Sequence, residues 1–489
     1  EDGIRDIGVT GVQTCALPIF SIQAYGDGKK PVVHNLGVDS QSGTRTTPTT
    51  SARVTFINLD ANSNSILTDR YYYNIGAELQ SLRSASDVLF YRCNTFNFIA
   101  GTLIRYEWSQ TNADKSVPWP RPRRNFWYEC NANNKSYTGT TVSNTAQPFF
   151  AQMYEFALLG CKSVFPREHG IRVQGAQYGI IAHNRIYTAD GDKSTLTIRG
   201  DGVQNAAAAI LNSNTTQPAT RFIVAADNYL GDFYDMDNRR DKLNGQIAWV
   251  LQISPEDNIT TESQEFVIAE RNKYANINAY SLVYTSVRGN RQITVRDEIY
   301  LANSLSQNGV GGTPEFGKTS PTGVGNVLSP QYALQNVSPY PLWANGPIWT
   351  NCSAPGEIDN VYMFSTPTAI ISKVAGSNVQ AELAAYGWGQ TATSGQYIAG
   401  PAPLVVFFDA TDTKSANANT NTFREFGYHF DFGYDAANAA IIGNWQYSGK
   451  PKANQIGGPI ATHMYEIPGT YVAGLRVQNS LGEYQDKYI

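Results

Sequence analysis

Residues 266–274, FVIAERNKY, hold the pattern that decides the fold: an apolar run, then Asn or Asp, any residue, and an apolar or aromatic residue. The pattern returns, in part degenerately, at 88–96, 180–186, 223–230 and 293–299, with its polar residue at 94, 184, 228, 272 and 297. These positions differ by 90, 44, 44 and 25 residues, about four, two, two and one times a unit of ~22 residues, which is the length class of β-solenoid coils. Because a coil cannot bury its apolar face alone, the spacing predicts stacked coils.

The segments between these points favour strands over helices. They are short, rich in Val, Ile, Tyr, Phe and Thr, and separated by Gly, Asn, Asp and Ser, with no long 3.6-residue apolar period. We expect the repeated Asn to occupy a left-handed turn position and to pass amide hydrogen bonds along the stack. The alternative is that these are ordinary turn asparagines of a β-sandwich.

The composition of the chain, 42% hydrophobic and 16% charged residues, also agrees with an all-β fold. The net charge of -4 gives no reason to expect a nucleic-acid partner, and no apolar run is long enough to span a membrane. Besides Cys15, the chain has four cysteines, at 93, 130, 161 and 352, and they form no CxxC pair, which disfavours a zinc or redox site. Cys130 and Cys161 bracket an apparent insertion and suggest a loop-closing disulfide; the alternative is that all four are buried free thiols.

The first nineteen residues, EDGIRDIGVTGVQTCALPI, resemble the in-frame translation of a synthetic sequencing adapter. A secretion signal is the competing interpretation, but the segment starts acidic and lacks both basic residues before its apolar part and an initiator Met. We therefore exclude residues 1–19 from the fold and expect that a native signal peptide has been lost upstream.

Residues 20–33, FSIQAYGDGKKPVV, open the remaining chain, and HGIRVQG at 169–175 and LTIRG at 196–200 follow in later coils. These segments, over roughly 20–302, resemble the secreted right-handed parallel β-helix proteins of the pectin-lyase-like superfamily. The resemblance implies a right-handed parallel β-helix, which we assign to residues 20–350. It does not imply one activity, since that superfamily contains lyases, hydrolases, epimerases and phage tailspikes.

A second resemblance lies in PLVVFFDA at 403–410, YHFDFG at 428–433 and HMYEIPGTY at 463–471. These alternating segments are similar to the PKD domain, an immunoglobulin-like sandwich of bacterial extracellular enzymes; the P-G-x-Y corner is present, whereas the turn after Gly433 departs from the usual sequence. We assign 401–489 to a PKD-like sandwich, truncated inside its last strand, and 351–400 to a connector or last coils.

An inserted loop at 114–143 is the first candidate for substrate binding, because its aromatic faces suit sugar rings and its arginines suit uronate or sulfate groups. The alternative is a loop that packs its aromatics on the coil wall. The candidate substrate-binding residues are Trp119, Arg121, Arg123, Arg124, Trp127 and Tyr128.

Two arginines on strands form the candidate catalytic cluster. In the segments around Arg172 and Arg199 the apolar neighbours point inward, so both guanidinium groups point outward and would neutralise a uronate carboxylate. His169 and His183 are the candidate proton-transfer groups. The alternative is that the histidines are structural and that the arginines pair with nearby carboxylates.

Asp232, Asp235 and Asp237 form an acidic loop that is a candidate Ca²⁺ site, the one cofactor the sequence suggests. The alternative is neutralisation by Arg239 and Arg240. The sequence thus predicts an extracellular or cell-surface monomer that binds, and degrades as lyase or glycoside hydrolase, an acidic polysaccharide. The alternative function is a non-catalytic adhesive protein that binds glycans or partners.

Overall fold

A computed structural model places a large part of the chain. It describes residues 20–23, 32–34, 54–57, 60–62, 87–96, 100–105, 123–133, 147–164, 166, 169–187, 194–200, 220–231, 247–255, 264–275, 279–285, 290–296, 298–300, 348–350, 379–387, 390–415, 422–423, 426–479 and 483–489. Trp119, Arg121, Cys352 and the aspartates at 232, 235 and 237 lie outside these residues.

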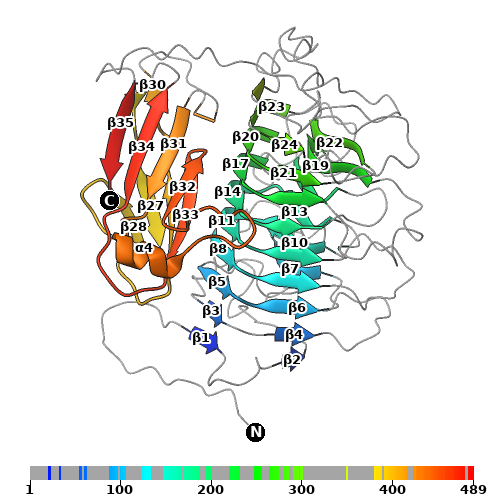
Figure 1. The fold of residues 1–489 in the computed structure, drawn as a ribbon, viewed down its shortest axis with the longest axis horizontal. Helices are drawn as coiled ribbons and strands as arrows, with labels where there is room; N and C mark the ends of the chain where they lie inside the picture. The colour runs from blue at the N-terminus through cyan, green and yellow to red at the C-terminus, as the bar shows by residue number, and fades with distance from the viewer. Residues whose placement is uncertain are drawn as a thin grey trace, which may run out of the picture.

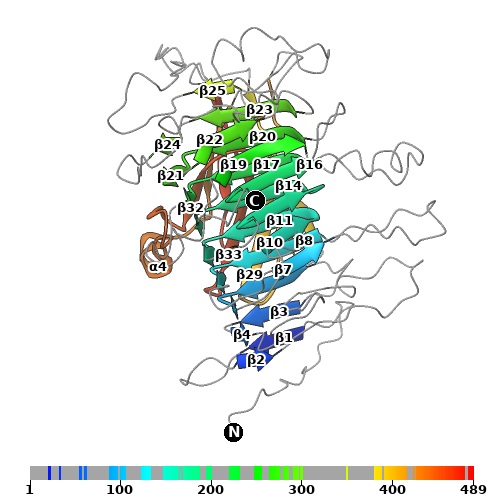
Figure 2. The same cartoon turned by 90° about the vertical axis from the view of Figure 1, so that its right-hand side faces the viewer.

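Three parallel sheets form the larger unit (Figures 1 and 2). Sheet A contains β1 (Phe20–Gln23), β3 (Val54–Ile57), β5 (Val88–Tyr91), β8 (Arg123–Tyr128), β11 (Tyr154–Leu159), β14 (Gln177–Ala182), β17 (Thr220–Ala226), β20 (Gln264–Glu270), β23 (Asn290–Arg296) and β25 (Ile348–Thr350). Sheet B contains β2 (Val32–His34), β4 (Asp60–Asn62), β6 (Asn94–Phe96), β9 (Asn131–Asn133), β12 (Lys162–Val164), β15 (Arg185–Ile186), β18 (Tyr229–Gly231), β21 (Lys273–Ala275) and β24 (Ile299–Tyr300). Sheet C contains β7 (Ala100–Arg105), β10 (Gln147–Gln152), β13 (Ile171–Gln174), β16 (Leu196–Gly200), β19 (Ile247–Pro255) and β22 (Ala279–Thr285).

The chain visits the sheets in the order A, B, C and then pairs with the previous strand of sheet A. The stack is therefore all parallel, and it is consistent with the expected parallel β-helix. Side chains alternate along each strand. On sheet A, Phe90, Leu158 and Ile181 point into the core, whereas Tyr91, Leu159 and Ile180 belong to a second buried cluster on the outer face. Both faces of sheet A are thus covered.

The predicted ladder of buried amides is present where sheet A turns into sheet B. The Nδ2 of Asn184 donates to Asn228 Oδ1 at 2.9 Å, and the Nδ2 of Asn228 donates to Asn272 Oδ1 at 2.9 Å. Asn272 Nδ2 then donates to Glu298 Oε1 at 2.9 Å. Side-chain hydrogen bonds therefore run from coil to coil through the core edge, as the sequence predicted.

The predicted coil length was wrong in detail. Strand β14 pairs directly with β17, and β17 pairs directly with β20, so each gap of 44 residues is one coil carrying a long insertion and not two coils of ~22. The ladder is also offset at its ends: Cys93 and Glu298 occupy the positions assigned to Asn94 and Asp297. Asn94 instead begins a strand of sheet B and pairs with Asn131.

In each turn, the residue with the left-handed backbone conformation is the one that precedes the ladder residue. This preceding residue is Arg92, Glu129, Gly160, His183, Asp227 or Arg271, with φ between 52° and 65°. The expectation that the ladder Asn itself is left-handed was therefore wrong. The ladder residue itself is buried and hydrogen bonded. In the earlier coils the ladder position holds Cys93, Cys130 and Cys161, which are free buried thiols. No disulfide therefore joins Cys130 to Cys161; the Cys130 thiol instead donates to the Phe90 carbonyl at 3.2 Å and the Cys161 thiol to the Trp127 carbonyl at 3.5 Å.

The second unit is an antiparallel sandwich of two four-stranded sheets. One sheet has the order β28 (Gln390–Thr393), β27 (Ala384–Gly387), β29 (Leu404–Asp409), β33 (Ile460–Tyr465), and the other β32 (Asn454–Gly457), β31 (Phe426–Asp431), β34 (Gly474–Asn479), β35 (Tyr484–Tyr488). A further pair joins β26 (Val379–Gln380) to β30 (Lys414–Ser415), and α4 spans Ala436–Ile442. Thus β26, β27 and β28, from the range assigned to a connector or last coils, pair with sandwich strands.

The sandwich lies against the outer face of sheet A (Figure 1). Its contribution to the shared cluster comes from Val405, Phe407, Phe423, Trp445, Ile460 and Met464. At the margin of this apolar contact, the Tyr91 hydroxyl donates to Glu466 at 2.5 Å and Arg271 Nη2 donates to the Ile456 carbonyl at 2.6 Å. Apolar burial therefore drives the docking of the two units, and polar contacts fix its position.

No helix in the described part of the chain has the length and apolar character needed to cross a membrane.

We predict that Asn228→Ala lowers the free energy of unfolding by about 2–4 kcal/mol, because it removes four buried side-chain hydrogen bonds, two from Asn184 and one each to the Ile181 carbonyl and Asn272 Oδ1. Chemical denaturation measures the change. The control is Asn444→Ala at an exposed position, which should stay within about 0.5 kcal/mol of the parent. Equal stability of the two variants would contradict a structural role for the ladder.

Candidate functional site

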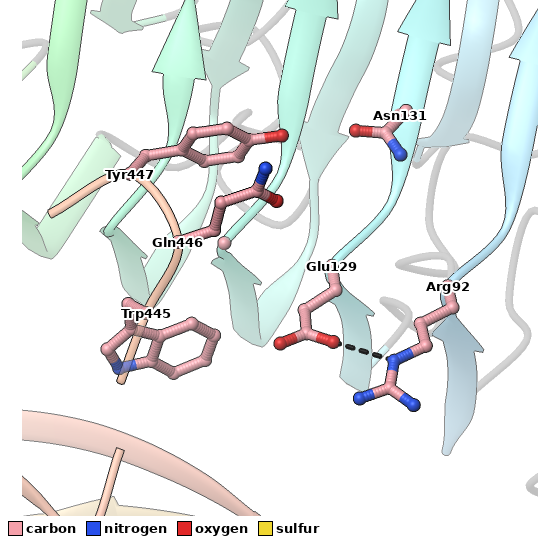
Figure 3. Close-up of a pocket in the computed structure, with 7 residues that line it drawn as sticks. Arg92, Glu129, Asn131, Trp445, Gln446 and Tyr447 are labelled. Carbon is pink, nitrogen blue, oxygen red and sulfur yellow. Dashed lines mark hydrogen bonds and ion pairs between the residues drawn. The ribbon is translucent and has the colours of Figure 1, made fainter. Parts of the chain in front are cut away.

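A pocket of about 280 Å³ lies at the seam between the coils and the sandwich (Figure 3). We call it the seam pocket. The coils contribute Arg92, Glu129, Asn131 and Gly160, and the sandwich contributes Trp445, Gln446 and Tyr447. The pocket thus contains two aromatic rings, two amides and an ion pair.

The turn between sheets A and B positions the coil residues. Arg92, Glu129 and Gly160 hold the same left-handed position in successive coils, so their side-chain positions line up along the stack. Gly160 leaves space for the sandwich, since a Cβ built at this residue would lie 2.8 Å from two carbon atoms of the Trp445 ring. The absence of a side chain at one coil therefore admits the tryptophan that closes the pocket.

A tight loop of the sandwich carries Trp445 to this gap. The Trp445 amide donates to the Lys450 carbonyl at 2.8 Å, and the Gly449 amide donates back to the Trp445 carbonyl at 2.9 Å. The ring is buried, stacks on His183 with centroids 4.9 Å apart, and lies 5.0 Å from the Tyr128 ring. Gln446, which is exposed, and Tyr447, which is half-buried, follow Trp445 in this loop (Figure 3).

One carboxylate in the pocket carries a negative charge between two cations. Arg92 Nε donates to Glu129 Oε2 at 2.8 Å, and Lys452 donates to the other carboxylate oxygen. Burial alone would raise the pKa of Glu129, but the hydrogen bonds and charges of Lys452 and Arg92 lower it overall. Glu129 is therefore ionised at neutral pH and serves as an anchor for the surrounding donors, not as a proton donor.

The remaining pocket groups are neutral hydrogen-bonding groups. Asn131 Nδ2 donates to Asn94 Oδ1 at 2.9 Å, which holds the Asn131 amide in place. Burial raises the pKa of Tyr447 to about 12, so its hydroxyl stays protonated and can donate. Aromatic faces combined with amide, hydroxyl and charged groups are the side-chain chemistry that recognises sugar rings and their hydroxyls.

The four predicted substrate-binding residues that the structure describes do not form one binding surface. Arg123, Arg124, Trp127 and Tyr128 belong to strand β8, not to an inserted loop. Trp127 is in the core at 1% exposure and Tyr128 lies under the sandwich at 2%, so neither presents a face to a ligand. This corrects the loop assignment: RRNFWY alternates as a strand with both faces covered.

Arg123 and Arg124 lie at the opposite end of β8 from Glu129 and both contact Glu155. The distances are 3.2 Å for Arg123 Nη1 and 3.1 Å for Arg124 Nη1, and Arg124 also pairs with Asp87. These arginines therefore take part in an ion-pair network at the start of sheet A. The seam pocket contains neither of them.

Arg172 and Arg199 lie on adjacent strands of sheet C, as predicted, and share its outer face. They are not directly opposite each other: Arg172 pairs with Thr197, and Arg199 pairs with Gln174, so the two are diagonal. The Arg172 guanidinium lies 5.2 Å from the Phe150 ring, and Arg199 Nη2 donates to Gln252 Oε1 at 3.3 Å.

The two histidines do not come together. His169 precedes β13 and is 1% exposed, with Nδ1 3.0 Å from the Ser194 carbonyl oxygen. His183 follows β14, where Trp445 covers it and Nδ1 lies 2.8 Å from Ser448 Oγ. Burial, with smaller contributions from Arg271 and Lys450, lowers the pKa of His183 to about 3. His183 is thus a neutral interface residue, which corrects its assignment to proton transfer.

The candidate calcium loop cannot be compared with the structure, since Asp232, Asp235 and Asp237 lie outside the described residues. Within the residues that are described, no group of three or more His, Cys, Asp or Glu side chains is arranged to hold a metal ion. The Ca²⁺ site stays a prediction from sequence.

The sequence analysis missed Trp445, Gln446 and Tyr447. The sequence feature that could have indicated a binding loop is the pair of aromatic residues in the short polar segment GNWQYSGK, 443–450, which lies outside any alternating strand. Their importance follows from docking against Gly160, and this contact joins residues 285 positions apart.

No known protein-family model matches this chain, and no curated protein matches it significantly. The function must therefore be argued from the chemistry of the residues themselves.

We predict that acid weakens the docked structure through His183. Because its folded pKa of about 3 is below the ordinary 6.5, the unfolded chain binds the proton more readily, and stability present above pH 6.5 is lost as pH falls toward 3. His183→Asn tolerates the left-handed backbone and removes this titration, so it should reduce the stability lost between pH 7 and pH 4 by roughly 2–3 kcal/mol.

The measurement is denaturant unfolding at a series of pH values. His429→Asn, at an exposed position on β31, is the control and should keep the pH dependence of the parent. An unchanged pH profile in His183→Asn would show that this histidine does not couple protons to docking.

Proposed function

We propose that the protein binds an extracellular polysaccharide at the seam pocket. The observation that supports this most is the composition of the pocket wall, where Tyr447 supplies a half-buried ring and Asn131, Gln446 and the Arg92–Glu129 pair supply hydrogen-bonding groups, while the buried ring of Trp445 forms part of the wall. Sugars need both kinds of surface, since their rings have apolar faces and their edges carry hydroxyls. The two units must be docked for the site to exist.

The finer fold assignments support this proposal. We infer that the coils are a right-handed β-helix of the pectin-lyase-like kind, in which an inward Asn ladder and long insertions between strands are compatible features. We infer further that the sandwich is PKD-like, since Tyr471 of the P-G-x-Y corner donates to the Ile467 carbonyl at 2.7 Å, as a tyrosine corner does. Modules of this kind in secreted bacterial proteins favour an extracellular location.

Binding fits the seam pocket better than cleavage does. Hydrolysis by a carboxylate pair needs two carboxyl groups with different protonation states across the bond. Glu129 is the one carboxylate among the residues that line this pocket, and its lowered pKa leaves it unable to act as the acid. The adhesive, non-catalytic alternative is therefore the better account of this pocket.

A second candidate function is lyase cleavage on sheet C. It rests on the outward placement of Arg172 and Arg199 on paired strands, where two guanidinium groups would neutralise a uronate carboxylate and acidify the neighbouring C–H bond. His169 lies two residues before β13, the strand of Arg172, but at 1% exposure it does not face a ligand on this surface.

We predict that Tyr447→Ala and Asn131→Ala each weaken polysaccharide binding by about tenfold, since each removes one ring or amide contact. Affinity electrophoresis in gels containing pectate, alginate, chondroitin or a neutral glucan measures retardation. Tyr397→Ala, at a tyrosine 81% exposed and outside the pocket, is the control and should bind like the parent. Binding that survives both pocket substitutions would exclude the seam pocket as the site.

For the second candidate we predict ultraviolet absorbance from unsaturated ends, together with new reducing ends, when the protein is incubated with pectate, alginate or chondroitin, with and without Ca²⁺. Arg172→Ala and Arg199→Ala should each abolish both signals, whereas Arg476→Ala on β34 should not. Reducing ends without the ultraviolet signal would mean hydrolysis. Silence in both assays with binding retained would leave the adhesive function.

A further inference from the structure

The charged groups at the seam pocket are paired with one another (Figure 3). Arg92 Nε donates to Glu129 Oε2 at 2.8 Å, and Arg92 Nη2 lies 3.8 Å from Glu466 Oε2. Lys452, whose side chain is 8% exposed, contacts the other carboxylate oxygen of Glu129. Two cations and two carboxylates therefore meet at this margin, and the charges of the four groups cancel.

The neutral groups of the pocket hold hydrogen-bonding capacity that a ligand can use. Asn131 uses its Nδ2 for a bond to Asn94, and within the described residues no hydrogen bond reaches Asn131 Oδ1. In the same part of the chain, the side chains of Gln446 and Tyr447 make no hydrogen bond. Side-chain amides and a tyrosine hydroxyl supply both donors and acceptors. The pocket therefore offers a ligand both kinds of group without a net charge.

An anionic sugar would lose its hydration here without gaining a counter-charge of its own. A carboxylate or sulfate that leaves water needs a cation and hydrogen bonds to offset the loss. The cations of the pocket already contact Glu129, so an anion that approached them would also approach this carboxylate and be repelled. Lys162, the register partner of Asn131, does not line the pocket, and its Nζ lies 5.7 Å from the Tyr187 ring. An uncharged ligand meets neither cost.

The volume of the pocket limits how much of a glycan it can hold. Ligand pockets in proteins commonly enclose roughly 300–1,000 Å³. The seam pocket, at about 280 Å³, lies just below that range. One sugar residue, at the end of a chain or on a side branch, is the part of a glycan that suits a pocket of this size.

We propose that the seam pocket binds one neutral sugar residue of an extracellular glycan and discriminates against uronate and sulfated sugars. The Tyr447 ring packs on the apolar face of the sugar, while Asn131 and Gln446 bind its hydroxyls. Glu129, with a side chain 22% exposed, accepts a further hydroxyl through lone pairs that its two ion pairs leave. The proposal rests on the polysaccharide function proposed above and adds the charge class and the size of the ligand.

The test is titration calorimetry of the full chain with dextran, mannan and galactan as neutral glycans and polygalacturonate and chondroitin sulfate as acidic ones, at low and high salt. We expect the parent to bind at least one neutral glycan at least about tenfold more tightly than either acidic glycan. Salt should change this affinity by less than about twofold, because it screens only interactions between charges. Tyr447→Ala should weaken the same binding.

Glu129→Gln tests the charge argument directly. The substitution keeps the shape of the side chain but leaves Arg92 and Lys452 without the anion that they share, so the ratio of acidic to neutral affinity should rise at least about tenfold. Glu466→Gln removes the other carboxylate beside Arg92 and alters no residue that lines the pocket. It should shift the ratio in the same direction.

The matched control is Asp486→Asn. It frees Arg476 from an ion pair of 2.8 Å on β34 and β35, away from the residues that line the pocket, and should keep the ratio of the parent within about twofold. A thermal melt of each variant verifies that it is folded.

Each other outcome decides against a specific statement. An acidic glycan that binds more tightly than every neutral one, and loses that binding in Tyr447→Ala, would overturn the neutral class and keep the seam pocket. An unchanged ratio in both Glu129→Gln and Glu466→Gln would overturn the selection by charge. Binding that survives both Tyr447→Ala and Asn131→Ala would overturn the seam pocket itself. Failure of the parent to bind any of these glycans would overturn both proposals.

Discussion

Every described coil from 87 to 275 turns from sheet A into sheet B through the same two backbone positions, a left-handed residue followed by a buried side chain. This constraint fixes the register of the whole stack. Because amide and carbonyl groups of the ladder bond to the next coil, a strand cannot slip by one residue without breaking several buried hydrogen bonds at once. Fixed register in turn aligns the residues of successive turns into columns, and one such column, Arg92, Glu129 and Gly160, lines the seam pocket.

The ladder also explains which parts of the fold could be predicted from sequence. The sequence pattern around Asn184, Asn228 and Asn272 is local. Its strands, its turn and its side-chain amide hydrogen bonds therefore follow from a few neighbouring residues. The coil count did not follow, because a gap of 44 residues is compatible with two short coils or with one coil and a long insertion. Pairing between β14 and β17 decides this, and pairing is not visible in spacing alone.

The candidate site was harder to predict, because burial depends on what covers a face. Trp127 and Tyr128 lie in an aromatic, arginine-rich segment that looks like a binding loop, yet one ring points into the core and the other lies beneath the sandwich. His183 has the residue type of a proton-transfer group, but Trp445, 262 positions later, removes it from solvent. Outward placement of Arg172 and Arg199 was predictable, since it needs only strand alternation, while their diagonal offset needed the register.

Covering sheet A determines where a ligand can bind. Its outer face carries Leu, Ile, Val and Tyr side chains that would be unfavourable in water, so the sandwich covers an apolar surface that would otherwise be exposed. The cover ends at the turn into sheet B. There Glu129 forms ion pairs with Arg92 and with Lys452 of the sandwich, and Gly160 leaves room for Trp445. A pocket with mixed aromatic and polar walls arises at that margin because the apolar contact stops and the polar columns begin. Docking therefore removes one sheet from solvent and, at its edge, creates the seam pocket.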